Sequence, residues 1–240
     1  MLQPPDYINE ANVIGVKVTY KWEGTVHYNR ESPPLIKQLA RLSHAARLSV
    51  GLGIAEWIAW RFQGLAHDED SIRLLEAGWA AMADPSYAKS WSATQEKRPH
   101  DALGGAVFAF KDQLSSLLSA ERARRKSPKT SSGGPARTVV QLAFLARHVL
   151  PNAKPFDRWL KSTLARLSEL HPKQSDEAFG EPVPRQALDP DFNYAPDESS
   201  TLLDGYLRGL DWKANSFLRS PEELNAAGFV GKAYRFPSES

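Results

Sequence analysis

LSVGLGIAEWIAWRF, residues 48–62, is the most apolar stretch of the 240-residue chain. From Ile54 to Phe62 its apolar side chains follow the three- and four-residue spacing that places them on one face of a helix. The stretch is about 15 residues long and contains Glu56 and Arg61, so it is too short and too charged to span a bilayer comfortably. It therefore predicts a helix of a soluble protein and not a membrane span.

The apolar spacing continues on the N-terminal side of this stretch. Pro33 and Pro34 stand where a helix can begin, and apolar residues at helical spacing follow from Leu35 onward. Because glycine is a poor helix former, we expect Gly51 and Gly53 to break or kink this helix before the apolar stripe resumes.

Helical spacing dominates the rest of the chain. Three carboxylates at residues 68–70 precede another apolar stripe, where they favour a helix start through capping and the helix dipole. Further helices are expected from about residue 101, over 136–150 and 155–170, from about residue 199 and over 221–227. Since short loops join these helices, the sequence predicts a mainly α fold, an irregular multi-helix bundle of antiparallel helical hairpins, in a single domain over residues 1–240.

The N-terminal part has a different pattern. From Ile14 to Trp22, apolar residues alternate with glycine, lysine and threonine, which is typical of a strand with one apolar face. Gly24 follows and can form a turn before a second short apolar run. A short β-hairpin over residues 12–30 is therefore expected.

Composition excludes several kinds of chemistry and favours one location. The chain has no cysteine, which excludes disulfides, thiolate nucleophiles and cysteine-ligated metals. Its first residues, MLQPPDYINE, contain no basic stretch followed by an apolar run, so no signal peptide is expected. We expect a cytoplasmic protein that does not act at a membrane.

Two side chains are candidates for acid–base chemistry. Glu56 lies among indole-bearing residues, and a carboxylate desolvated there could act as an acid or base. The alternative is that Glu56 lies on the exposed edge of the helix or pairs with an arginine such as Arg47 or Arg61. His100 with Asp101 could form a general base, but no GxSxG motif supplies a serine nucleophile. We therefore expect no enzymatic activity and assign no catalytic residue.

Residues 67–70, His-Asp-Glu-Asp, are the densest cluster of potential metal ligands. Adjacent residues on a loop do not easily converge on one ion, and helix capping accounts for the three acids. Gly51-Leu52-Gly53 lacks the preceding strand and the third glycine of a dinucleotide-binding fingerprint. Neither a metal nor a cofactor is expected.

A basic segment covers residues 122–137. Its basic residues are Arg122, Arg124, Arg125, Lys126, Lys129 and Arg137. Such a run can bind nucleic-acid phosphates, although it has no interleaved aromatic residues to stack on bases. A solvated helix end is the simpler interpretation. An α-helical scaffold or nucleic-acid-binding adaptor acting through this segment is the alternative function.

The opposite charge is concentrated at residues 176–204, which carry eight acidic side chains and one basic one, Arg185. The local charge of −7 leaves +9 for the remainder of a chain whose net charge is +2. Prolines disfavour a regular helix here, so residues 171–198 are expected to form a long acidic, proline-rich loop. Loops of this length are usually functional or disordered.

The acidic loop is the predicted contact surface for a partner. Its acids would steer association, and its aromatic residues would anchor the partner. The predicted partner-binding residues are Asp176, Glu177, Phe179, Glu181, Asp189, Asp191, Phe192, Tyr194, Asp197 and Glu198.

The chain resembles the immunity proteins of bacterial polymorphic and type VI secretion toxins. The resemblance is one of overall character, carried by AEWIAWRF at 55–62, EAGWAAMADPSY at 76–87 and the acidic run after His171. It implies a non-catalytic cytoplasmic protein that binds and neutralises a cognate protein toxin. An acidic surface would complement a toxin with a basic active-site cleft, although the net charge of +2 departs from the acidic balance expected of such a role.

Overall fold

The computed structural model describes residues 2–66, 69–91, 99, 101–126, 134–175 and 179–236, and these contain nine α-helices and no β-strand. The helices are Asp6–Asn9 (α1), Pro33–Leu39 (α2), His44–Phe62 (α3), Asp70–Ala83 (α4), Ala102–Lys126 (α5), Gly134–Val149 (α6), Lys154–Leu170 (α7), Ser199–Arg208 (α8) and Pro221–Ala226 (α9). The predicted mainly α class is confirmed.

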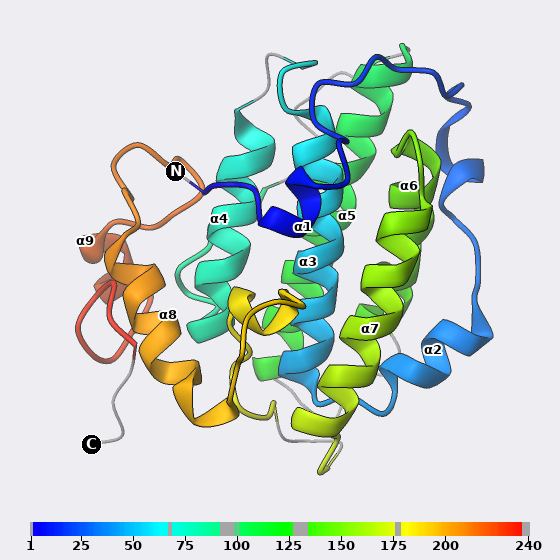
Figure 1. The fold of residues 1–240 in the computed structure, drawn as a ribbon. Coiled ribbons are helices and arrows are strands. Elements are labelled where there is room, and N and C mark those ends of the chain that lie inside the picture. Colours follow the sequence, from blue (N-terminus) through cyan, green and yellow to red (C-terminus); the bar gives the residue numbers. More distant parts are fainter. Residues whose placement is uncertain are drawn as a thin grey trace.

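Helix α3 is the centre of the fold. It packs against α4, α5, α6 and α7, which surround it in Figure 1. Because α3 has neighbours on all sides, Leu48, Ile54, Trp57 and Phe62 are all buried, and the helix shows apolar residues around its whole circumference. The helical pattern predicted from Ile54 to Phe62 is confirmed. None of the helices in the described part of the chain is long and apolar enough to cross a membrane.

The predicted break at Gly51 and Gly53 is wrong, because both residues lie within α3. The helix instead begins after Ser43, whose Oγ accepts a hydrogen bond from the amide of Ala46 at 3.1 Å. A Cβ atom on Gly53 would lie only 2.5 Å from Cδ1 of Leu188. The glycines therefore allow neighbouring side chains to approach the helix closely.

The predicted β-hairpin over residues 12–30 is also wrong. Residues 13–31, called here the N-terminal strap, follow an irregular path with one 3₁₀ turn at Gly24–His27. The guanidinium of Arg61 donates hydrogen bonds to the carbonyl oxygens of Val16, at 2.5 Å, and Lys17, at 3.2 Å. Since side chains satisfy these backbone groups, the strap is held on the bundle without a second strand.

A stacked pair of histidines fastens the other end of the strap. The rings of His27 and His148 lie with their centroids 3.8 Å apart and their planes at 13°. Nε2 of His27 accepts a hydrogen bond from the amide of Glu23 at 2.8 Å, and Nε2 of His148 lies 2.8 Å from the carbonyl oxygen of Lys21. Burial lowers the pKa of His148, and the nearby His27 and Arg30 lower it further, against a raising effect of the Lys21 carbonyl.

We expect acidification to weaken the fold partly through His148. Because its pKa is lower in the folded than in the unfolded chain, the unfolded chain binds the proton first. The contribution of His148 is therefore fully present above the ordinary histidine pKa of about 6.5. It decreases as the pH falls below that value and is lost once the pH has fallen through the lower pKa of the folded state. Urea unfolding at several pH values between about 7.5 and 5 measures the effect.

His148→Asn is the comparison for this pH series. The variant should show a smaller loss of unfolding free energy on acidification, because asparagine does not titrate in this range. His171, whose pKa burial also lowers, contributes in the same direction in both proteins. Identical pH dependence in the two proteins would contradict the role given to His148.

Candidate binding surface

The acidic segment, defined here as residues 179–198, lies between α7 and α8 and contains no α-helix. It has two 3₁₀ turns, Arg185–Leu188 (η4) and Pro196–Glu198 (η5). In Figure 1 the first of these turns (yellow) and α1 cross the same side of α3. The predicted contact residues Asp176 and Glu177 lie outside the described residues.

A buried ion pair fixes η4 to the central helix. Nε of Arg185 donates to Oε1 of Glu56 at 2.5 Å, and Nη2 donates to Oε2 at 2.8 Å. The side chain of Glu56 is fully buried, whereas that of Arg185 is 22% exposed. Burial lowers the pKa of Arg185, but the charge and hydrogen bonds of Glu56 outweigh it, so this pKa is raised overall.

Glu56 is therefore paired, as one of the two expectations held, but with a different arginine. Its Oε1 also accepts a hydrogen bond from Nε1 of Trp79 at 2.7 Å. Arg61 binds backbone carbonyls of the strap, and Arg47 binds the carbonyls of Leu39 and Leu42. Both oxygens of Glu56 thus accept hydrogen bonds from side chains of the protein itself.

Three side chains outside the acidic segment also hold it. Two of them bind its backbone carbonyls, and the third, His171, contacts the hydroxyl of Tyr194. Nε1 of Trp159 donates to the carbonyl of Leu188 at 3.0 Å. The guanidinium of Arg166 donates to the carbonyls of Asp189 and Phe192, both at 2.6 Å. The remaining contact is made by Tyr194, whose hydroxyl lies 2.8 Å from Nε2 of His171 and 2.6 Å from Oγ of Ser199. Burial raises the pKa of this tyrosine, and the hydroxyl remains neutral and bonded.

Of the three predicted aromatic anchors, only Phe192 is exposed, at 37% for the whole residue. Tyr194 is 5% exposed. Phe179 packs against the core, and the guanidinium carbon of Arg125 lies 3.5 Å from the centroid of its ring. Phe179 and Tyr194 therefore attach the segment to its own protein, where the sequence analysis expected them to contact a partner.

The predicted acids are mostly on the outside. Glu181, Asp191, Asp197 and Glu198 are exposed, and Asp189 is half-buried. Glu198 also accepts a hydrogen bond from the amide of Ala195 at 3.2 Å, so part of its role is to close η5. The acidic segment thus exposes carboxylates and one phenyl ring, while its backbone is held by hydrogen bonds to side chains of the helical bundle.

The arginines of the basic segment bind groups within the protein, whereas the sequence predicted a solvated helix end. Arg122 donates to Oγ of Ser90 and to the carbonyl of Ala88, both at 2.6 Å. Arg124 is 2% exposed and pairs with Glu121 at 2.8 Å.

The third arginine of this run, Arg125, donates to the carbonyl of Met82 at 3.1 Å, and burial lowers its pKa to about 10. Lys129 lies outside the described residues, and Arg137 is exposed. The three arginines Arg122, Arg124 and Arg125 therefore bind α4, its following loop and Glu121 within the protein.

The acidic cluster at residues 67–70 is only partly described. His67 and Asp68 lie outside the described residues, as does His100. Glu69 makes no side-chain cap to α4; it forms a salt bridge with Arg73 at 2.6 Å, and Asp70 lies 3.6 Å from the same guanidinium group. In the part of the chain that the structure describes, no three histidine or acidic side chains are grouped as metal ligands would be.

Comparison of the chain with protein-family models, with curated proteins and with solved structures gave no match.

Proposed function

We propose that this chain is a non-catalytic binding protein that neutralises a cognate protein toxin, and that it contacts the toxin through the acidic segment. The observation that carries the proposal is the combination of exposed carboxylates with a backbone held by Arg185, Trp159 and Arg166. A segment fixed before binding loses less conformational entropy when the complex forms. The proposal includes a cytoplasmic location, where the toxin would act.

The charge of the segment defines the kind of partner. Glu181, Asp191 and Asp197 form an acidic surface suited to a basic cleft, such as one that binds a phosphate-bearing substrate. Complementary charges of this kind mainly accelerate association and exclude wrong partners. The exposed ring of Phe192 supplies the apolar contact that charge alone does not provide.

A nucleic-acid-binding function through residues 122–137 has less support. Arg122, Arg124 and Arg125 are engaged within the protein, and of the predicted basic residues with described side chains only Arg137 is exposed. Salt-dependent binding of DNA or RNA that is lost in an Arg137→Ala variant would favour this alternative.

The proposed function is tested with the product of a reading frame adjacent to the gene. Its expression in bacteria should arrest growth, and co-expression of this protein should restore growth. The triple variant Glu181→Gln, Asp191→Asn and Asp197→Asn should associate with that toxin about tenfold more slowly at low salt, because the steering charges are gone. Surface plasmon resonance at several salt concentrations measures this rate.

A matched control removes three exposed charges that lie outside the acidic segment, in and just before the N-terminal strap. The variant Glu10→Gln, Glu23→Gln and Glu31→Gln should associate at nearly the wild-type rate. Equal slowing in both triple variants would indicate a general charge effect and contradict the acidic surface. Failure of the protein to restore growth would contradict toxin neutralisation.

A further inference from the structure

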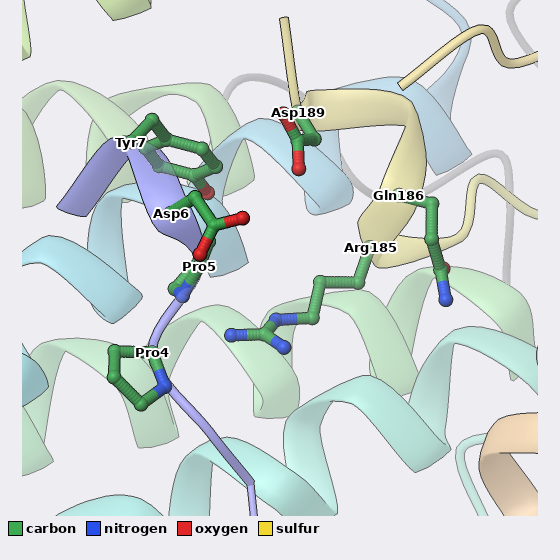
Figure 2. A pocket seen from close by; sticks show the side chains of 7 residues that line it. All are labelled: Pro4, Pro5, Asp6, Tyr7, Arg185, Gln186 and Asp189. Carbon is green, nitrogen blue, oxygen red and sulfur yellow. The ribbon is translucent and has the colours of Figure 1, made fainter. Parts of the chain in front are cut away.

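A pocket of about 220 Å³ opens between the N-terminal segment and η4 (Figure 2). It is lined by Pro4, Pro5, Asp6, Tyr7, Arg185, Gln186 and Asp189. We propose that this pocket receives one cationic side chain, an arginine or lysine, from the protein partner. The inference rests on the proposed function and specifies where a basic residue of the toxin is seated.

The electrostatic balance of the pocket favours a cation. The guanidinium of Arg185 is neutralised by Glu56, with which it forms two hydrogen bonds. Asp6 and Asp189 have no salt bridge within the described residues; Oδ1 of Asp189 accepts only the amide of Asp191 at 3.0 Å. Figure 2 shows the carboxylates of Asp6 and Asp189 extending from the two chain segments that form the pocket. Within the part of the chain that the structure describes, these two carboxylates therefore have no basic partner.

The walls suit the apolar stem of such a side chain. Pro4, Pro5 and the ring of Tyr7 are mainly apolar, and long cationic side chains pack their methylene groups on surfaces of this kind. The Tyr7 ring is stacked on Trp159 with centroids 5.6 Å apart and lies 5.9 Å from Trp57, so this wall is firmly supported.

The hydroxyl of Tyr7 provides a further polar group beside the pocket. Its oxygen is buried and has no hydrogen-bond partner in the described part of the chain. Burial, with the charge of Glu56, raises the pKa of this tyrosine well above its ordinary value, so the hydroxyl is neutral and its oxygen can accept a hydrogen bond. An incoming guanidinium has five donors for the carboxylates of Asp6 and Asp189.

The size of the pocket selects the kind of occupant. Pockets for drug-sized ligands and cofactors usually measure about 300–1,000 Å³, and this one holds about 220 Å³. A single long side chain fits such a volume better than a cofactor does. Asp189 belongs to both the pocket and the acidic segment, so a partner on the acidic surface can reach the pocket.

The test uses a small probe and does not need the toxin. N-acetyl-arginine methylamide should cause saturable shifts of the amide signals of Tyr7, Arg185 and Gln186 in NMR titrations at low salt. N-acetyl-citrulline methylamide has nearly the same shape without the charge, and it should bind at least roughly tenfold more weakly.

Variants locate the binding. The double variant Asp6→Asn, Asp189→Asn should bind the arginine probe roughly tenfold more weakly, because asparagine keeps the shape of aspartate and removes its charge. Glu10→Gln removes an exposed carboxylate close to Asp6 in sequence, outside the pocket lining, and should leave probe binding within about twofold. Circular dichroism confirms that each variant is folded.

Each outcome decides the inference separately from the proposed function. Equal binding of the citrulline probe, the absence of saturable shifts, or unchanged binding in the double variant would overturn the cationic pocket. None of these results would contradict the proposed toxin neutralisation, which the growth experiment tests separately. If the probe binds as expected while growth is not restored, the pocket is retained and the proposed function fails.

Discussion

Replacing Arg185 with methionine is expected to lower the free energy of unfolding by about 3–5 kcal/mol. Among the described residues, the change leaves the fully buried carboxylate of Glu56 with the indole N–H of Trp79 as its one hydrogen-bond donor. A buried charge that loses its counter-ion carries most of its desolvation cost without compensation. Urea unfolding followed by circular dichroism measures the loss.

Two comparisons isolate the ion pair. Arg208→Met breaks a surface salt bridge with Asp204 whose arginine is 57% exposed, so it should cost less than about 1 kcal/mol. Adding Glu56→Gln to Arg185→Met removes the stranded charge and keeps an acceptor for Trp79, so part of the stability should return. A double variant less stable than Arg185→Met alone would show that the ion pair is not the cause.

This ion pair also shows how far the sequence could predict the site. A helix over the apolar stretch was predictable because the apolar residues from Ile54 to Phe62 follow helical spacing. Its continuity through Gly51 and Gly53 was not, because it depends on neighbours that approach the helix closely. The sequence also singled out Arg185 as the one base among eight acids. Its pairing with Glu56 spans 129 positions, and no local pattern encodes a contact of that range.

The strand predicted in the N-terminal strap is absent for a related reason, namely that long-range contacts decide how its backbone is hydrogen-bonded. Its alternation from Ile14 to Trp22 records one side chain in two packing on the bundle, and an extended segment shows the same period whether or not a second strand pairs with it. Here Arg61 and His148 bind the strap's carbonyl groups. Alternation therefore predicted which side chains pack on the bundle and could not predict what satisfies the hydrogen bonds of the backbone.

Charge runs were the least reliable guide to exposure. Arg124 and Arg125 read as a solvated helix end, yet one is paired with Glu121 and the other lies over the ring of Phe179. The residue type itself was a useful signal in both cases, because the guanidinium group of arginine readily binds carbonyls, carboxylates and aromatic faces inside proteins. The acidic segment differs because its carboxylates have few such partners nearby, and most of them remain exposed.

Gly53→Ala is expected to destabilise the protein by about 1–3 kcal/mol, even though alanine forms helices better than glycine by about 1 kcal/mol. The new Cβ would lie 2.5 Å from Cδ1 of Leu188 and 2.9 Å from the Trp159 ring, so both side chains must shift. Leu188 belongs to η4, and its displacement would also disturb the pairing of Arg185 with Glu56. Thermal or urea unfolding measures the change.

Gly205 in α8 provides the matched control, because no atom outside the local helix lies within 4 Å of a Cβ built there. Gly205→Ala should therefore stabilise the protein, by up to about 1 kcal/mol, through helix propensity and a less flexible unfolded chain. The two substitutions are chemically identical and both lie within helices, so the opposite signs isolate the cost of crowding at Gly53. If Gly53→Ala were also stabilising, the close approach of Leu188 and Trp159 to α3 would not be what requires glycine at this position.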